Sequence, residues 1–189
     1  MSLTRLLLVA ANSKKYIEGA GKDRIHIKPQ SSSSPYTGEV VLCFQLDEVA
    51  HSLGIPKTDK RCDGLIFYAQ DDKDERIFCL VEMKSDDVKD AAQQIKSTRD
   101  HLKMLLRTEC EPYCNKQFNR IKWKACFYHH GSLPDNVNAA LRQLKNDGFD
   151  DIEDFTVNNN DAGPFIRNEG GKNAKELAKN YQRGNKRKK

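Results

Sequence analysis

Residues 63–85 have the sequence DGLIFYAQDDKDERIFCLVEMKS, and this stretch decides the expected fold. Its two apolar runs, 64–69 and 76–85, contain the β-branched and aromatic residues that are typical of strands. The polar residues 70–75 between them have turn character and no apolar face. We therefore predict a β-hairpin, and the expected site depends on how its two strands pair.

The strand pairing predicts that two acidic side chains meet. If the hairpin is symmetric about its turn, opposed residues have numbers that sum to 145, as those of Gln70 and Glu75 do, so Asp63 lies directly across from Glu82. Opposed residues share one face of a sheet and have β-carbons roughly 4.5–5.5 Å apart. Lys84 projects from the same face as Glu82, because side chains two positions apart on a strand point the same way. The hairpin thus gathers two carboxylates and one ammonium group.

Apolar periodicity assigns the other elements. It predicts a helix over 40–53, a long amphipathic helix from about residue 86 to 106, a strand over 120–130, a helix over 134–146 and a last strand over 152–157. Helices that alternate with strands favour an α/β fold. We expect a mixed central sheet in which a β-hairpin carries the active site and helices flank the sheet.

The composition bounds the class of protein. Of the 189 residues, 38% are hydrophobic and 31% are charged, which fits one globular domain with a polar surface. We expect a single domain over 1–171 and a basic C-terminal tail over 172–189. The apolar run at 6–11 is shorter than the roughly 20 residues of a membrane span and lacks the features of a secretory signal. We therefore expect a cytoplasmic protein without membrane contact, a core helix or strand at 6–11, and six reduced cysteines.

The positive charge is concentrated at one end of the chain. The net charge is +5, but residues 172–189 hold eight Lys or Arg and one Glu, which gives that segment +7 and leaves −2 for the rest. A basic segment of this kind can hold a phosphate backbone through counterion release, although a solvated chain end has the same composition. We expect nucleic acid to contact the tail and the strand at 120–130 through Lys122, Lys124, Arg183, Lys186 and Arg187.

The opposed acids of the hairpin predict a metal ion. Like charges that face each other on a sheet are destabilising and ask for a compensating cation. Mg²⁺ or Mn²⁺ meets this need, since such ions prefer oxygen ligands and keep waters that leave room for a phosphate. Lys84 can orient or help to deprotonate an attacking water there. The alternative is a solvated ion pair between Glu82 and Lys84, but this pair ends an apolar strand and has Asp63 across from it.

These residues resemble a known superfamily. Asp63, then Glu82 and Lys84 at the end of a hairpin strand, then a helix that contains Ala and Gln, are similar to the PD-(D/E)xK nucleases, which include restriction enzymes, junction resolvases and defence nucleases. The resemblance covers roughly residues 40–130 and departs from the nominal motif at Cys62, where the family name has proline. It implies a restriction-endonuclease-like core in which Asp63 and Glu82 bind metal and Lys84 acts at the nucleophile.

The resemblance also implies accessory residues. Many members bring a glutamate from the preceding helix to the metal, and Glu48 matches that place, with Glu39 as the second choice. Some members also place a glutamine of the following helix near the site, and Gln93 or Gln94 matches that position.

The expected activity is that of a Mg²⁺- or Mn²⁺-dependent endonuclease that hydrolyses phosphodiester bonds, with DNA favoured as substrate. The chain is small and has no recognisable reading domain, so we expect a homodimer or delivery by a partner protein, as in a prokaryotic antiviral defence or DNA-processing system. The alternatives are a non-catalytic subunit that uses the fold for interaction or nucleic-acid binding, and an RNase of the same fold.

Cysteines and histidines offer a rival metal site. Cys110 and Cys114 could form half of a zinc site with Cys126 or with His129 and His130, but a second close pair at zinc spacing is missing. We therefore expect thiols rather than zinc. Neighbouring residues on a strand face opposite ways, so only one of the two histidines can serve acid–base chemistry at a shared site. We expect a loop or strand-end role for both.

Overall fold

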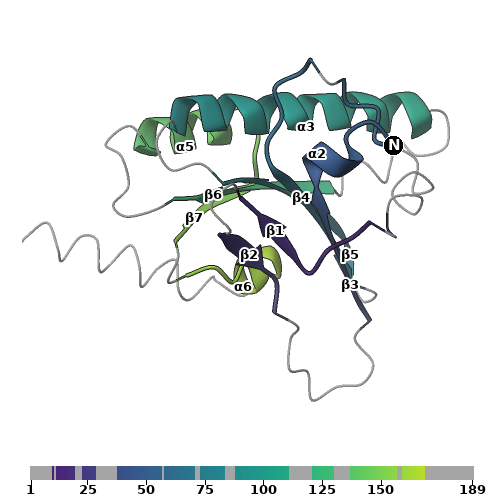
Figure 1. The fold of residues 1–189 in the computed structure, drawn as a ribbon, viewed down its shortest axis with the longest axis horizontal. Coiled ribbons are helices and arrows are strands. Elements are labelled where there is room, and N and C mark those ends of the chain that lie inside the picture. Colours follow the sequence, from purple (N-terminus) through teal and green to yellow (C-terminus); the bar gives the residue numbers. More distant parts are fainter. Residues whose placement is uncertain are drawn as a thin grey trace, which may run out of the picture.

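A five-stranded mixed sheet forms the centre of the molecule (Figure 1). The structure is a computed structural model and describes residues 10, 12–19, 23–28, 38–56, 58–70, 73–83, 88–110, 121–129, 137–156 and 159–168. The strand order follows the chain: β3 (Glu39–Gln45), β4 (Gly64–Gln70), β5 (Lys73–Glu82), β6 (Ile121–Tyr128) and β7 (Asp151–Phe155). β3 pairs antiparallel with β4 and β4 antiparallel with β5, whereas β6 pairs parallel with β5 and β7 parallel with β6. The protein therefore belongs to the α/β class.

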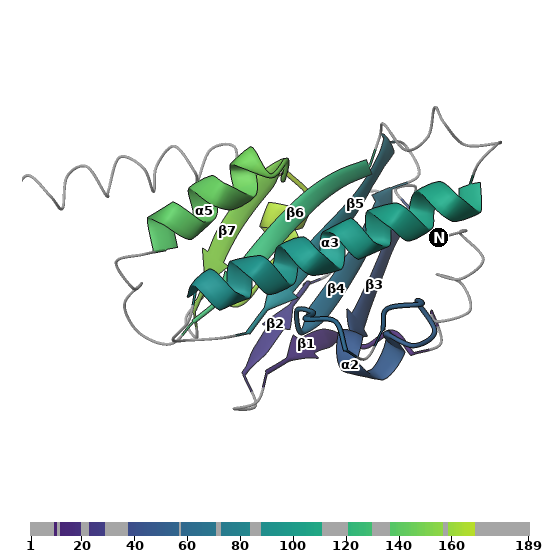
Figure 2. The same cartoon turned by 90° about the horizontal axis from the view of Figure 1, so that it is seen from above.

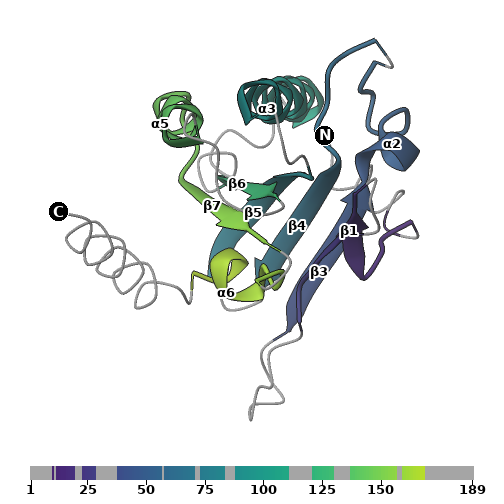
Figure 3. The same ribbon diagram turned by 60° about the vertical axis from the view of Figure 1, so that its left-hand side comes forward.

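The two faces of the sheet are covered by different elements. Helix α3 (Val88–Cys110) contacts β5 and β6 and lies beside α5 (Val137–Asn146), so these two helices cover what we call the helix face (Figure 2). The opposite face, which we call the second face, carries the strand pair β1 (Tyr16–Glu18) and β2 (Arg24–His26) together with the short helix α6 (Gly163–Ile166) (Figure 3). Both faces of the central strands are therefore buried.

A separate apolar cluster fills each side of the sheet. On the helix face, Phe67, Phe78 and Trp123 from three neighbouring strands pack ring against ring, with centroids 5.3 and 5.2 Å apart. On the second face, Ile17 of β1 lies so close to β4 that a β-carbon at Gly64 would come within 2.5 Å of it. Glycine at the start of β4 is what permits this close approach.

The predicted hairpin and its register are confirmed. Residues of β4 and β5 pair with numbers that sum to 145 from Gly64 with Val81 to Ala69 with Arg76. The turn is not symmetric, since Gln70 pairs with Lys73 and the register shifts next to it. The extra residues lie on the β5 side as an irregularity near the turn, so the strand bodies keep the predicted pairing.

The elements predicted after the hairpin are also confirmed. The structure has α3 in place of the long amphipathic helix, β6 for the strand at 120–130, α5 for the helix at 134–146 and β7 for the last strand. Among the residues that the structure describes, no helix combines the length and the apolar character of a membrane span. The apolar run at 6–11 and the tail at 172–189 lie outside the described residues, apart from Ala10.

The predicted helix over 40–53 is wrong for its first half. Residues 39–45 form β3, and only Leu46–Val49 form a helix, α2. Apolar residues in β3 are needed on both sides, because Phe44 packs into the cluster of the helix face and Cys43 into that of the second face. A continuous apolar run satisfies a strand buried on both faces as well as it satisfies a helix, so periodicity did not separate the two.

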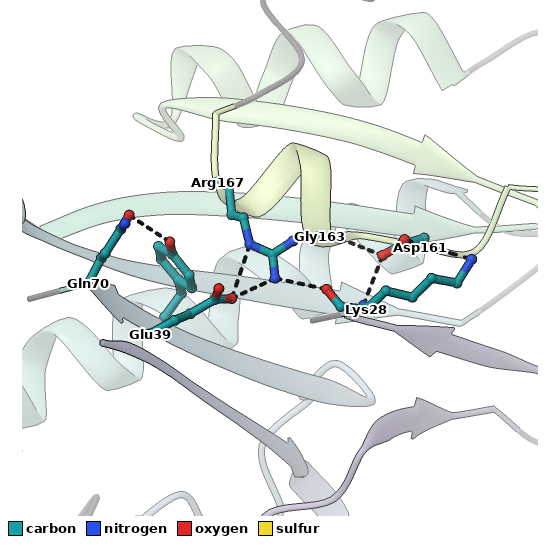
Figure 4. A network of polar contacts seen from close by, with 7 residues as sticks. Lys28, Glu39, Gln70, Asp161, Gly163 and Arg167 are labelled. Atoms are coloured by element: carbon teal, nitrogen blue, oxygen red, sulfur yellow. Dashed lines mark hydrogen bonds and ion pairs between the residues drawn. The ribbon is translucent and has the colours of Figure 1, made fainter. Parts of the chain in front are cut away.

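A polar clamp fastens α6 to the edge of the sheet (Figure 4). The Nε and Nη2 groups of Arg167 donate to Oε1 of Glu39 at 3.0 and 2.6 Å, and Nη2 also donates to the backbone oxygen of Lys28 at 2.8 Å. Beside it, Oδ1 of Asp161 accepts the backbone N–H groups of Lys28 and Gly163 at 3.1 and 3.0 Å. The clamp joins segments that are more than a hundred residues apart in the sequence.

Candidate metal centre

Asp63 and Glu82 lie at the end of the β4–β5 hairpin that is distant from its turn. Asp63 comes one position before the pair of Gly64 with Val81, and Glu82, the last residue of β5, comes one position after it, so the two acids flank the last pair of the hairpin. Glu82 alternates with Leu80 and therefore projects on the helix face. Oδ2 of Asp63 accepts the backbone N–H of Met83 at 2.7 Å, which holds the Asp63 carboxylate against the end of β5.

Both acids act electrostatically on a neighbouring thiol, that of Cys62. Burial raises the pKa of Cys62 well above its usual range, and the negative charges of Glu82 and then Asp63 raise it further, while a hydrogen bond with Thr98 acts against them. Both carboxylates therefore lie near the same sulfur atom. Glu82 is buried, with 1% of its surface exposed, whereas Asp63 is partly exposed. Two acids in a site of low solvent access favour a bound cation.

The first half of α3 lies over this site. The backbone N–H of Cys62 donates to Oγ1 of Thr98 at 3.0 Å. One helical turn earlier, the side-chain amide of Gln94 donates to Asp90 at 2.9 Å, and Lys60 pairs with the other oxygen of Asp90 at 2.7 Å. Gln94 is partly buried on the side of α3 that leads to Thr98, so it is the better placed of the two candidate glutamines.

The candidates Gln93 and Glu48 point to the surface. Gln93 is exposed on α3. Glu48 follows β3 on α2, as the resemblance implies, but its side chain is exposed and pairs with Lys14. Within the described residues, no group of three or more His, Cys, Asp or Glu side chains is arranged to hold a metal ion. Among the described residues, Asp63 and Glu82 are therefore the carboxylates that a metal ion at this end of the hairpin would contact.

Glu39, the second choice for an accessory site residue, lies at the far end of β3 from Asp63 and Glu82. It pairs with Gln70 at the end of β3 next to the hairpin turn, while Gln45 pairs with Gly64 at the site end. Six residues of strand separate these positions by roughly 20 Å. The Glu39 carboxylate instead binds Arg167 in the clamp of Figure 4.

Lys124, predicted to contact a nucleic-acid backbone, is enclosed in the described part of the chain. Its side chain is 1% exposed on the second face, where Nζ donates to the backbone oxygen of Phe165 and, at 2.7 Å, to Oδ1 of Asn168. Burial lowers the pKa of Lys124. An ammonium group enclosed in this way holds the end of α6 and does not reach a ligand. Lys122 is partly exposed, and its contact with nucleic acid stays a prediction.

Several predicted residues lie outside the described part of the chain. These are Lys84, Cys114, His130 and the tail residues Arg183, Lys186 and Arg187, together with the side chain of Cys110. The role of Lys84 at the nucleophile therefore stays a prediction.

The described cysteines are free thiols, as predicted. Cys43, Cys62, Cys79 and Cys126 are all buried and unbridged. Cys126 faces Cys79 across neighbouring strands, with sulfur atoms 3.2 Å apart on the second face. His129 lies on the other face, three residues along the chain, so Cys126 and His129 cannot share a zinc ion.

His129 and Asp154 form a polar pair beside this centre that the sequence did not predict as a pair. Nε2 of His129 lies 3.4 Å from Oδ2 of Asp154, at the carboxyl ends of β6 and β7. Asp154 sits in a strand of mostly acidic residues, and only the parallel register of β6 with β7 distinguishes it from its neighbours.

Comparison of the chain with models of known protein families, with characterised proteins and with solved structures gives no match. The resemblance to PD-(D/E)xK nucleases therefore depends on the hairpin residues and their setting. Any functional conclusion has to be drawn from the geometry of this site.

Proposed function

We propose that the protein is a Mg²⁺- or Mn²⁺-dependent nuclease with a restriction-endonuclease-like core, acting on DNA. The observation that supports this proposal is the register of β4 with β5, which ends with the pair of Gly64 and Val81 and makes Asp63 and Glu82 the next residues at that end of the hairpin. The order of the elements also supports it, because a hairpin bearing the acids is followed by a long helix and then by a parallel strand.

The donor set suits a hard divalent cation. Two carboxylates from adjoining strands supply oxygen ligands and would hold the ion, and they leave further positions for water and a phosphate oxygen. When bound, such an ion lowers the pKa of a coordinated water and offsets negative charge on the phosphate. The backbone N–H of Met83 fixes one oxygen of Asp63, so this carboxylate is oriented before any ligand arrives. On the resemblance, Lys84 orients the attacking water.

Substrate recognition by this chain would depend on a second protein copy or on a partner protein. The chain has no separate reading domain in the described residues, so we propose that it acts as a homodimer or is delivered by a partner protein in a defence or DNA-processing system. Lys122 and the basic residues of 172–189 would contribute backbone contacts, which carry no sequence information.

Nicking of supercoiled plasmid tests the proposal. The wild type should nick DNA with Mg²⁺ or Mn²⁺ and lose activity with a chelator. Asp63→Asn and Lys84→Ala should each reduce the rate by at least about 100-fold, as expected for groups that act in the transition state. Asp59→Asn, which changes an exposed acid outside the site, is the matched control and should cut like the wild type. Activity that survives chelation and both site substitutions would refute a metal-dependent centre here.

The burial of Glu82 favours one alternative. A carboxylate with 1% exposure is poorly accessible to solvent, which would suit a subunit that keeps the fold for interaction or nucleic-acid binding without catalysis. Such a protein would bind labelled DNA without cutting it and would bind equally well after Asp63→Asn. Labelled RNA in the same assay distinguishes an RNase of this fold.

A further inference from the structure

One row of residues crosses the helix face and extends the candidate centre. Glu82 at the end of β5 pairs with Phe127 of β6, and Phe127 pairs with Asp154 of β7, while Asp63 immediately precedes the pair of Gly64 with Val81. Paired residues project on the same face of a sheet, so Glu82 and Asp154 share the side covered by α3 and α5. The row thus joins the hairpin to strands that follow it by 40 to 70 residues.

His129 stands next to this row on the same face. Its backbone N–H donates to the oxygen of Phe155 at 3.0 Å, which continues the pairing of β6 with β7 by one step. His129 comes two residues after Phe127 and therefore projects on the same face as Phe127. Its Nε2 atom lies 3.4 Å from Oδ2 of Asp154. From strand rise and strand spacing, the α-carbon of His129 lies roughly 8 Å from that of Glu82.

In the part of the chain that the structure describes, the second ring nitrogen of His129, Nδ1, is free to bind a ligand. His129 is 4% exposed, and within the described residues its Nδ1 atom is buried and has no hydrogen-bond partner. Buried polar atoms without partners are uncommon in native proteins, and they mark a bound water, an ion or a functional role. Asp154 keeps more than a third of its side chain exposed, so the pair has one enclosed end and one end in contact with solvent.

The position of the pair also points to a ligand. In open α/β sheets, ligands bind beyond the carboxyl ends of the strands at the point where the strand order reverses. The order of this sheet does not reverse, so only the gathering of polar groups at this end of the strands points to a ligand here. His129 and Asp154 lie at the carboxyl ends of the parallel strands β6 and β7, and Glu82 ends β5, which is parallel to both. A phosphodiester held by the acids at the end of β5 would therefore extend toward His129.

We propose that His129, oriented by Asp154, is the proton donor for the leaving oxygen of the cleaved phosphodiester; this inference rests on the proposed nuclease function. The carboxylate of Asp154 accepts Nε2–H, which leaves Nδ1 as the nitrogen that can exchange a proton with a ligand. If Lys84 serves the attacking water, as the proposed function has it, the His129 side is left for the departing oxygen.

In the proposed step, water attacks phosphorus and the leaving oxygen departs with a proton from His129. The oxygen of water forms the new bond to phosphorus and its proton passes to solvent. The bond between phosphorus and the leaving oxygen breaks, and its electron pair stays on that oxygen, which takes the proton from Nδ1 of His129. The ring is then protonated only at Nε2, and Nδ1 regains a proton from solvent after the product leaves. The products are a phosphomonoester and an alcohol.

The experiment compares two leaving groups in the full-length protein. A DNA duplex is cut with Mn²⁺ by the wild type, by His129→Gln and by Asp154→Asn, and the cleaved position is mapped. The same duplex is then prepared with sulfur in place of the leaving oxygen at that position, since a thiolate departs without needing a proton. His51→Gln, at an exposed histidine outside the site, is the matched control. Thermal unfolding of each variant reports whether it is folded.

The expected result is a loss that depends on the leaving group. His129→Gln should slow cleavage of ordinary DNA by about 100-fold and cleavage of the sulfur-containing DNA by less than about 3-fold, because general acid catalysis contributes about 10²–10⁴-fold when the leaving group is poor. Asp154→Asn should show the same pattern with a smaller loss, and it replaces His129→Gln if that variant does not fold. Equal losses on both substrates, or no loss on either, would overturn the proposal. A wild type that cuts neither substrate would instead refute the nuclease function on which the proposal rests.

Discussion

Replacing Arg167 by methionine should destabilise the protein by an amount that the clamp of Figure 4 allows us to work out. The Arg167 side chain is 5% exposed and that of Glu39 is 20% exposed. Breaking a fully buried ion pair costs about 3–5 kcal/mol, because the remaining charge is left without a partner. An exposed pair is worth about 0–1 kcal/mol. Since Glu39 retains some contact with water, we expect Arg167→Met to lower the free energy of unfolding by about 2–3 kcal/mol.

The assay is thermal and urea unfolding of Arg167→Met against a matched control. A loss of this size should lower Tm by about 5–10 °C in a domain of this length. The control is Arg24→Met, which breaks an Arg–Glu pair of similar chemistry to Glu18, with side chains 43% and 38% exposed, and should change Tm by less than about 3 °C. Adding Glu39→Gln to Arg167→Met should cost little more than the single change. Equal losses for the two arginines, or additive losses for Arg167 and Glu39, would show that burial does not make this pair important.

Three further predictions follow from the same structure. Addition of Mn²⁺ at about 100 times its dissociation constant should stabilise the wild type by about 2.7 kcal/mol, seen as a higher Tm, and Asp63→Asn should abolish the shift; a shift that persists in this variant places the ion elsewhere. Burial lowers the pKa of Lys124 from its usual value of 10.5, so the unfolded chain binds more protons just below that pH and the free energy of unfolding should rise with pH there. Lys124→Met should remove this contribution, and an unchanged pH dependence in urea unfolding contradicts it. Burial raises the pKa of Cys43 to about 12 and also raises that of Cys62, so neither should be alkylated at pH 8 until the protein unfolds, as mass spectrometry of labelled peptides can show.

Strand register was predicted most accurately where the two faces of a strand pack against different apolar clusters. The register of the hairpin followed from the polar stretch between two apolar runs, and it held although the turn itself is asymmetric. Burial of Leu65 and Leu80 on one face, and of Ile66 and Cys79 on the other, fixes that pairing independently of the turn. A shift by one residue would turn every side chain to the wrong face.

The sequence predicted poorly where long-range contacts decide the structure. The run from Glu39 to Gln45 has the periodicity of either element, and it became a strand because β4 offers it an edge. Strands β1 and β2 have three residues each, too few for a periodic signal. Lys124 has the sequence character of a surface residue, and its burial depends on α6, which returns to it from 40 residues further along the chain.

Both proposals depend on acids whose positions are set by their apolar neighbours. Asp154 faces the helix side because Ile152 packs there and Phe155 packs into the cluster of the second face. In the same way, Leu80 and Val81 fix the side to which Glu82 turns. A slip of β7 by one residue would turn Asp154 to the side of Lys124, and His129 would lose its partner without any change in His129 itself. The geometry of the polar row is therefore a consequence of hydrophobic burial, and substitutions such as Phe155→Ala should disturb the site although the Phe155 side chain lies on the opposite face of the sheet.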